Sequence, residues 1–156
     1  MPDREQENKV VPDTMRTVVV SACLLGHNCR YDGGNNLNEK VLKAVEGCNV
    51  VPVCPEMLGG LPCPRIPCEI VDGKVCSRDG RNLDRQFREG AEKALEIARE
   101  SGAEVAILQS RSPSCGVNQV YDGTFSGRLV PGQGVFAELL SENGIRVVDA
   151  SDPGAV

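Results

Sequence analysis

Three cysteines occupy positions from which they could bind a metal together. Cys23, Cys54 and Cys115 each closely follow a short apolar run that is rich in β-branched residues. These runs are residues 17–20, 50–53 and 105–108. Such runs are typical of buried parallel strands, and ligands of an open α/β sheet bind beyond the carboxyl ends of its strands. The three thiols are therefore predicted to meet in one crevice, as a metal or iron–sulfur site.

The residue composition favours sulfur ligands for such a metal site. The chain has eight cysteines but one histidine, and soft thiolates without imidazole favour zinc or an iron–sulfur cluster. Three thiolates leave one metal position open, which a catalytic site needs. Cys29, in the first loop, is a candidate auxiliary thiol. For Cys63 and Cys68 the pattern leaves packing, mutual approach and metal binding open, whereas two others are expected only to pack: Cys48 and Cys76.

Polar residues on the same loops could carry acid–base or nucleophilic chemistry. Glu56 follows Cys54 on a loop stiffened by prolines, and it is a candidate general acid or base. Ser112 could act as a nucleophile or orient water, and Ser114 could bind substrate. Asp32 is a candidate catalytic or substrate-binding carboxylate, although its Asp-Gly turn alone would explain it.

Arginines on these loops could grip a phosphate. Arg30, Arg65 and Arg111 lie in the predicted crevice loops, and a guanidinium can bind phosphate through two hydrogen bonds. Solvated surface arginines are the alternative interpretation. His27, alone in a polar loop, is expected to lie on the surface.

The elements that must position these residues alternate between strand and helix. Strands are predicted at residues 16–22, 49–53, 104–109 and 145–148, and helices at about 37–46, 83–100 and 133–142. A small hairpin is expected around an Asp-Gly turn, joining 70–71 to 74–75, and a second Asp-Gly turn suggests either another hairpin, joining 119–121 to 124–125, or an excursion of the chain. The order indicates a single layered α/β domain with a mostly parallel, Rossmann-like sheet flanked by helices.

Composition bounds the class of protein. The length of 156 residues predicts one domain: a flexible tail over 1–15, the α/β domain over 16–150, and a C-terminal tail over 151–156. The net charge is −5. No apolar stretch resembles a membrane span or signal peptide, and a cytoplasmic protein is expected. Scarce aromatics and the lack of a basic run argue against nucleic acid as a partner. The oligomeric state is left open.

At these loops the chain resembles the thiouracil desulfidase family, also known as domain of unknown function 523. The resemblance covers about residues 17–149, and its motifs are specific because several occur in order. The matching segments are residues 21–26, 30–33, 52–56, 60–61, 64–65, 112–116 and 121–125.

The resemblance implies a cofactor and a reaction. Cys23, Cys54 and Cys115 would hold a 4Fe-4S cluster whose fourth iron has no protein ligand. Thiolated pyrimidines, as bases, nucleosides or nucleotides, would bind this iron through sulfur. Water oxygen would replace the sulfur without net redox change, and hydrogen sulfide would leave. The family's catalytic carboxylate and serine correspond to Glu56 and Ser112. Aerobically prepared protein could carry zinc instead.

Other classes of protein remain as rivals. A non-catalytic iron–sulfur or zinc module, acting as a sulfur carrier or sensor, would explain the cysteines but leave Glu56 and Ser112 without a task. A zinc enzyme using the same three cysteines is a second rival. A thiol redox protein usually has a Cys-x2-Cys pair, and a dinucleotide-binding domain has Gly-x-Gly-x-x-Gly after its first strand. The chain has neither motif.

Overall fold

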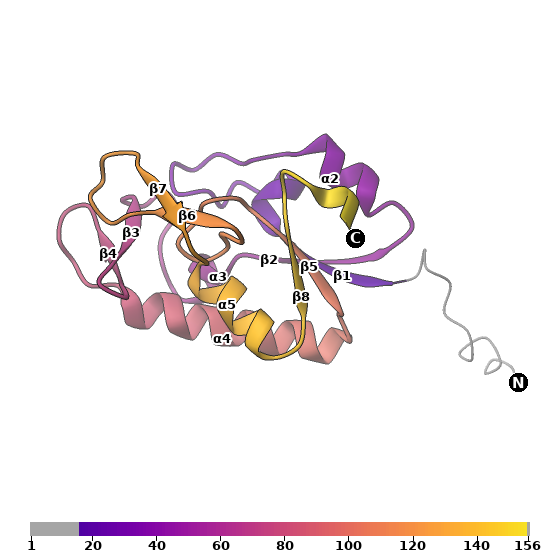
Figure 1. Ribbon diagram of the computed structural model, residues 1–156. Helices are drawn as coiled ribbons and strands as arrows, with labels where there is room; N and C mark the ends of the chain where they lie inside the picture. Colours follow the sequence, from indigo (N-terminus) through magenta and orange to yellow (C-terminus); the bar gives the residue numbers. More distant parts are fainter. Residues whose placement is uncertain (1–15, 156) are drawn as a thin grey trace, which may run out of the picture.

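Four parallel strands form the centre of the molecule. The structure is a computed structural model and describes residues 16–155. The strand order is β2 (Asn49–Val53), β1 (Thr17–Ser21), β5 (Val105–Leu108) and β8 (Arg146–Asp149) (Figure 1). In register, Val19 of β1 pairs with Val51 of β2 and with Ala106 of β5. The predicted mostly parallel sheet is therefore confirmed.

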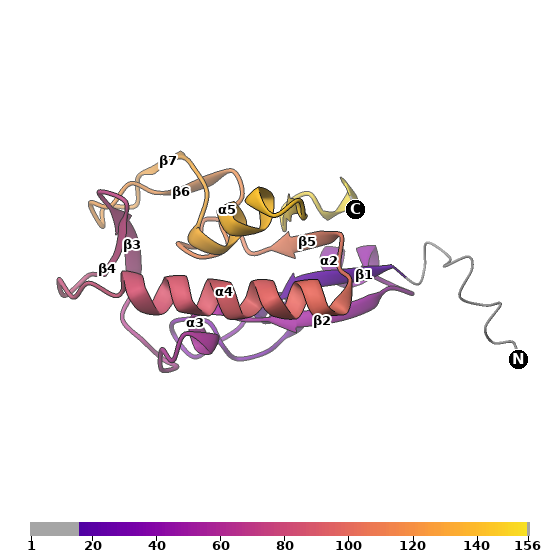
Figure 2. The ribbon, with the colours of Figure 1, turned by 90° about the horizontal axis from the view of Figure 1, so that it is seen from below.

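Helices cover both faces of this sheet. Successive side chains of a strand point to opposite faces, so Val19 packs with α4 (Asp84–Ser101) and α5 (Val135–Glu142). Val18 packs on the other face with α2 (Glu39–Ala44). Figure 2 shows α4 lying along one side of the strands. The two central strands, β1 and β5, are almost entirely apolar because both of their faces are buried, whereas the edge strands β2 and β8 begin with exposed polar residues.

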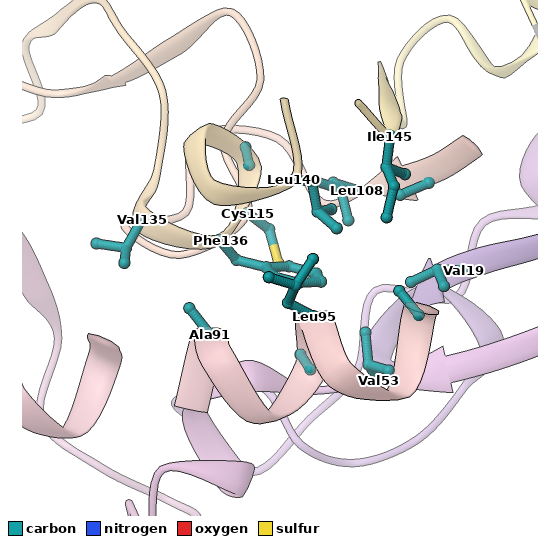
Figure 3. Close-up of a cluster of buried hydrophobic side chains, with 14 of the residues drawn as sticks. Val19, Val53, Ala91, Leu95, Leu108, Cys115, Val135, Phe136, Leu140 and Ile145 are labelled. Carbon is teal, nitrogen blue, oxygen red and sulfur yellow. The ribbon is translucent and has the colours of Figure 1, made fainter. Parts of the chain in front are cut away.

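The larger core lies between the sheet and α4 and α5. Phe87 of α4 and Phe136 of α5 are at most 1% exposed and are among the largest fully buried side chains. Cys115 belongs to this core, and Figure 3 shows its sulfur beside Phe136. The third candidate ligand is thus fixed by packing on its core side.

Short helical turns begin directly at the ends of the first two strands. A 3-10 turn, η2 (Ala22–Leu25), occupies the start of the predicted first loop, so the predicted strand ends one residue early. The predicted irregular loop after β2 begins instead with α3 (Pro55–Leu58). Cys54 is extended at the N-cap and Pro55 stands at the first helical position, where its fixed φ suits a helix.

Two antiparallel hairpins flank the sheet. The first, β3 (Cys68–Val71) with β4 (Lys74–Ser77), confirms the predicted hairpin around residues 72–73. The second prediction was wrong in its partner strand. β6 (Gln119–Tyr121) pairs with β7 (Leu129–Pro131), and residues 122–128 form a longer connection in place of a tight turn.

The predicted helices have bounds within two residues of the observed ones, and Gly102 ends α4 in the left-handed conformation. At the carboxyl end of the domain, residues 153–155 form the single turn η3 (Pro153–Ala155). The predicted tail over residues 1–15 lies outside the described residues. Within the described range, none of the helices is long and apolar enough to cross a membrane.

Backbone contact between α3 and α4 gives a first prediction. A Cβ atom at Gly90 would lie 1.9 Å from the carbonyl oxygen of Pro55. An alanine inside a helix normally stabilises by about 0.5–1 kcal/mol relative to glycine, but overpacking costs about 1–3 kcal/mol. Gly90→Ala is therefore expected to lower the free energy of unfolding by about 1–2 kcal/mol, as measured by urea denaturation.

The matched control is Glu92→Ala on the exposed side of α4, which should change stability by less than about 0.5 kcal/mol. A Gly90→Ala protein more stable than the wild type would contradict the close packing of the two helices.

Candidate thiol site and active centre

A cavity of about 910 Å³ opens at the carboxyl ends of the parallel strands. Its wall includes Cys23, Cys54 and Cys115, so the structure brings together three thiols that are distant in sequence. Cys23 lies in the first turn of η2, Cys54 caps α3, and Cys115 lies on the loop after β5. The carboxyl ends of β1, β2 and β5 therefore each place one thiol at the same cavity. Other lining residues proposed from the sequence are Glu56, Ser112, Ser114, Arg30, Arg65, Arg111, Cys29 and Cys68.

Polar groups from neighbouring segments contact the sulfurs. The Ser21 hydroxyl donates to Cys115 Sγ at 3.2 Å and accepts from the backbone N–H of Gln109. The Asn36 side-chain amide contacts Cys23 Sγ at 3.5 Å. Hydrogen bonds to sulfur are one of the means by which proteins tune iron–sulfur centres.

Cys29 is a fourth thiol of this site. Its side chain interacts with both Cys23 and Cys54 and is 8% exposed, and the Cys54 thiol donates to the carbonyl oxygen of Cys29 at 3.9 Å. The Cys29 side chain lowers the pKa of Cys23 and lowers the pKa of Cys54 to about 7, against the opposing effect of burial. The same interactions raise the pKa of Cys29 itself. Cys23 and Cys54 are consequently the thiols that most readily become thiolates.

Burial dominates at the third candidate ligand. It raises the pKa of Cys115 to about 12, in spite of the hydrogen bond from Ser21. Cys115 is therefore a neutral thiol at pH 7 in the metal-free protein. A bound cation reverses this preference, because a thiol that coordinates a metal is deprotonated.

Glu56 is held by an ion pair and a chain of hydroxyls. Arg65 binds its Oε1 through Nε at 2.8 Å and Nη2 at 2.7 Å, and the two side chains are only 7% and 13% exposed for Arg65 and Glu56, respectively. The Ser114 hydroxyl donates to Glu56 Oε2 at 2.9 Å, and Ser112 Oγ lies 2.9 Å from Ser114 Oγ. The carboxylate and Ser112 are thus connected through Ser114.

The direction of this chain follows from counting protons. Ser114 has one hydroxyl proton, which it donates to Glu56, so Ser112 must donate to Ser114. Ser112 Oγ also accepts the backbone N–H groups of Ser114 and Cys115, each at 3.0 Å. Two amide donors and a path to a carboxylate are the features that activate a serine oxygen.

Asp32 does not line the cavity. Its carboxylate pairs with Arg30 at 2.6 Å and accepts the backbone N–H of Gly34. Arg30 in turn donates to Asn36 Oδ1 at 2.9 Å, and Asn36 contacts Cys23. The structure thus places Asp32 behind Arg30, at the far end of a chain of contacts that ends on a candidate ligand.

The remaining candidates take varied places. Arg111 is exposed at the cavity wall with φ 67°, a left-handed conformation that is uncommon for a residue other than glycine. Arg65 donates hydrogen bonds to Glu56 and to the carbonyl oxygens of Cys29 and Pro62.

The four remaining cysteines and the single histidine lie outside the group formed by Cys23, Cys29, Cys54 and Cys115. Cys63 donates to backbone oxygens of the first loop, Cys68 lines the cavity with its pKa raised by burial to about 11, and Cys48 packs against the smaller core. Cys76 lies in β4, and His27 is exposed, as expected.

Ser21 and Asn36 are site residues that sequence reasoning missed. Ser21 ends a strand and begins the matching segment 21–26, and Asn36 lies in a polar loop outside the matching segments, but neither position by itself indicates a contact with sulfur. For Ser21 one signal was available, since it is the one polar residue in the otherwise apolar stretch 18–25.

The donor set fits an iron–sulfur cluster in its chemistry. Iron–sulfur clusters are bound by cysteine thiolates, and three thiols from separate strands line this cavity. Within the described residues, no three His, Cys, Asp or Glu side chains are grouped so as to hold a single metal ion. A four-iron cluster is larger than one ion, so its ligands stand further apart.

The fold and the cavity define a Rossmann-like α/β protein with a thiol-lined centre at the ends of its strands. The chain belongs to the 2-thiouracil desulfurase family, whose model matches residues 18–152. This match confirms the resemblance found in the sequence.

Two relatives show the extent of the similarity. The uncharacterized protein YbbK of Bacillus subtilis (strain 168) is 40% identical over 145 residues, which span 86% of this chain and 96% of that protein. A solved structure of a 4Fe-4S-dependent thiouracil desulfidase, TudS (DUF523Vcz), is 37% identical with a TM-score of 0.81. It covers 88% of this chain and 92% of its own.

Proposed function

We propose that this protein is a desulfidase that converts thiolated pyrimidines to their oxygen analogues and releases hydrogen sulfide. The reaction is hydrolytic and has no net redox change, and its substrates are thiouracil or thiouridine nucleotides. The observation that carries the proposal is the cavity in which three thiols face the Glu56–Ser114–Ser112 chain. Membership of a family named for 2-thiouracil desulfuration supports it.

The proposed cofactor is a 4Fe-4S cluster. Cys23, Cys54 and Cys115 would hold it, leaving one iron without a protein ligand. When bound, it supplies a soft Lewis acid that polarises the C=S bond and accepts the departing sulfur. The similarity to a 4Fe-4S-dependent desulfidase supports this choice of group. Abundant reduced thiols favour the cytoplasm as the compartment.

The protein residues transfer the proton that must leave the oxygen attacking the substrate carbon. As the Ser112 proton moves to Ser114 Oγ, the proton of Ser114 moves to Glu56 Oε2, so the Ser112 oxygen gains a lone pair with which to attack or to orient water. The N–H groups of Ser114 and Cys115 stabilise the charge that develops on this oxygen. Arg65 keeps Glu56 oriented, and Arg30 and Arg111 offer positive charge to a substrate phosphate.

Anaerobic reconstitution tests the function. The protein is treated with iron and sulfide, its iron and zinc are counted, and hydrogen sulfide release is measured from 2- and 4-thiouracil and their nucleotides. We expect about four irons per chain and sulfide release in parallel with formation of uracil. A protein that binds only zinc and releases no sulfide would contradict the proposal.

A non-catalytic cluster carrier is the second candidate, and the position of Cys29 favours it. A thiol in contact with Cys23 and Cys54 could close the fourth iron position. Cys29→Ala separates the two functions in the same assays. We expect it to retain iron and sulfide release, whereas loss of iron would indicate a closed cluster with four cysteine ligands.

A further inference from the structure

The aromatic side chains of this chain are divided between the core and the cavity. The sequence has two tyrosines, three phenylalanines and no tryptophan. Phe87 and Phe136 fill the larger core, and Tyr31, Tyr121 and Phe125 all line the cavity. Every aromatic ring that the core does not use therefore faces the space in which a ligand would bind.

Phe125 is held in a strained conformation by a buried carboxylate. Its φ of 57° is left-handed, and non-glycine residues persist there only where their surroundings hold them. Glu69 of β3 is 9% exposed, and its Oε1 accepts the backbone N–H groups of Gly123 at 2.9 Å and Phe125 at 3.1 Å. The first hairpin thus fixes the connection that follows β6.

The Phe125 ring is also positioned from the side. The guanidinium carbon of Arg78 lies 5.9 Å from the ring centroid, within the range of a cation–π contact. Arg78 lines the cavity as well. Backbone and ring are therefore both held before any ligand arrives, which reduces the entropy lost on binding.

Glu69 has an acceptor to spare. Both of its hydrogen bonds end on Oε1, and none of the described residues donates to Oε2. The residue lines the cavity, so Oε2 can accept a hydrogen bond from a ligand N–H or O–H group. Its fixed position beside the Phe125 backbone places an acceptor at the edge of an aromatic wall.

We propose that Phe125 and Glu69 recognise the pyrimidine ring of the substrate: Phe125 stacks on the ring face, and Glu69 Oε2 accepts a ring N–H. A thiolated pyrimidine has both a planar π-face and a ring N–H. The proposal rests on the proposed function, because it takes the ligand to be a pyrimidine. Tyr31 and Tyr121 complete the aromatic lining.

Two substitutions in the reconstituted protein test the recognition. Phe125→Leu keeps an apolar side chain at the strained position but removes the π-face. Glu69→Gln keeps the shape and the backbone contact but turns an amide N–H toward the ring. Each is expected to raise the Kd for uracil, measured by ligand-observed NMR, and the KM for 2-thiouracil about tenfold, with kcat and iron content unchanged.

The controls separate recognition from folding. Phe125→Tyr should restore binding relative to Phe125→Leu, and Glu92→Gln on the exposed side of α4 should bind uracil as the wild type does. Unchanged Kd and KM in Phe125→Leu, or a wild type that does not bind uracil, would overturn this proposal. A wild type that binds uracil yet releases no sulfide would contradict the proposed function alone.

Discussion

Cys115→Ala is expected to abolish cluster binding and sulfide release together. Only two of the three proposed ligands remain, which is too few for a four-iron cluster, and the lost ligand is the one fixed deepest in the core, at 4% exposure. Iron should fall from about four per chain to a trace, as measured after anaerobic reconstitution and desalting. The visible absorption of the cluster should disappear with it.

Two further variants show whether ligation or packing is responsible. Cys115→Ser keeps the volume and an acceptor for the Ser21 hydroxyl, so it should fold normally and still lose iron. Cys48→Ala removes a thiol that packs against the smaller core, and it should retain iron and activity. If Cys115→Ser retained four irons with full activity, Cys115 would not be a ligand.

Glu56→Gln is expected to lower kcat about 10²–10⁴-fold while iron content stays unchanged. The amide can still accept from Ser114, but it cannot take the proton that Ser112 passes on. The change also leaves Arg65 as a buried charge without its partner, which costs about 3–5 kcal/mol. Single-turnover kinetics measures the first effect and urea denaturation measures the second.

Glu89→Gln makes the same chemical change in the exposed ion pair with Arg85 and serves as the control. Exposed pairs contribute about 0–1 kcal/mol, so this variant should be nearly as stable and as active as the wild type. Undiminished kcat in Glu56→Gln would rule out the carboxylate as the end of the proton path.

The parallel sheet was predictable because its strands are buried on both faces. Continuous apolar runs such as 105–108 have few other uses in a chain of this length, and Gly102 marks the end of α4 clearly. The second hairpin was not predictable from its Asp122-Gly123 signal. Its true partner strand is short and ends in Pro131, a residue that argues against a strand.

The meeting of the three thiols was predictable, whereas the contacts around them were predictable only in part. Strand ends placed the three thiols in one crevice, since parallel strands share one carboxyl edge. The pairing of Arg65 with Glu56 depends on how the proline-rich loop folds back, and no spacing rule encodes that. For the same reason no sequence pattern predicts that Asp32 pairs with Arg30 and lies outside the cavity.

The origin of each thiol at a different strand end determines when the proposed centre can mature. A chain leaving the ribosome presents Cys23 and Cys54 well before Cys115, and Cys115 is placed only after β5 has paired with β1 and β8. Iron that arrives earlier meets thiols with no common geometry. A cluster held by the three proposed ligands would therefore be inserted after the sheet has formed, because only the paired strands bring the three thiols together.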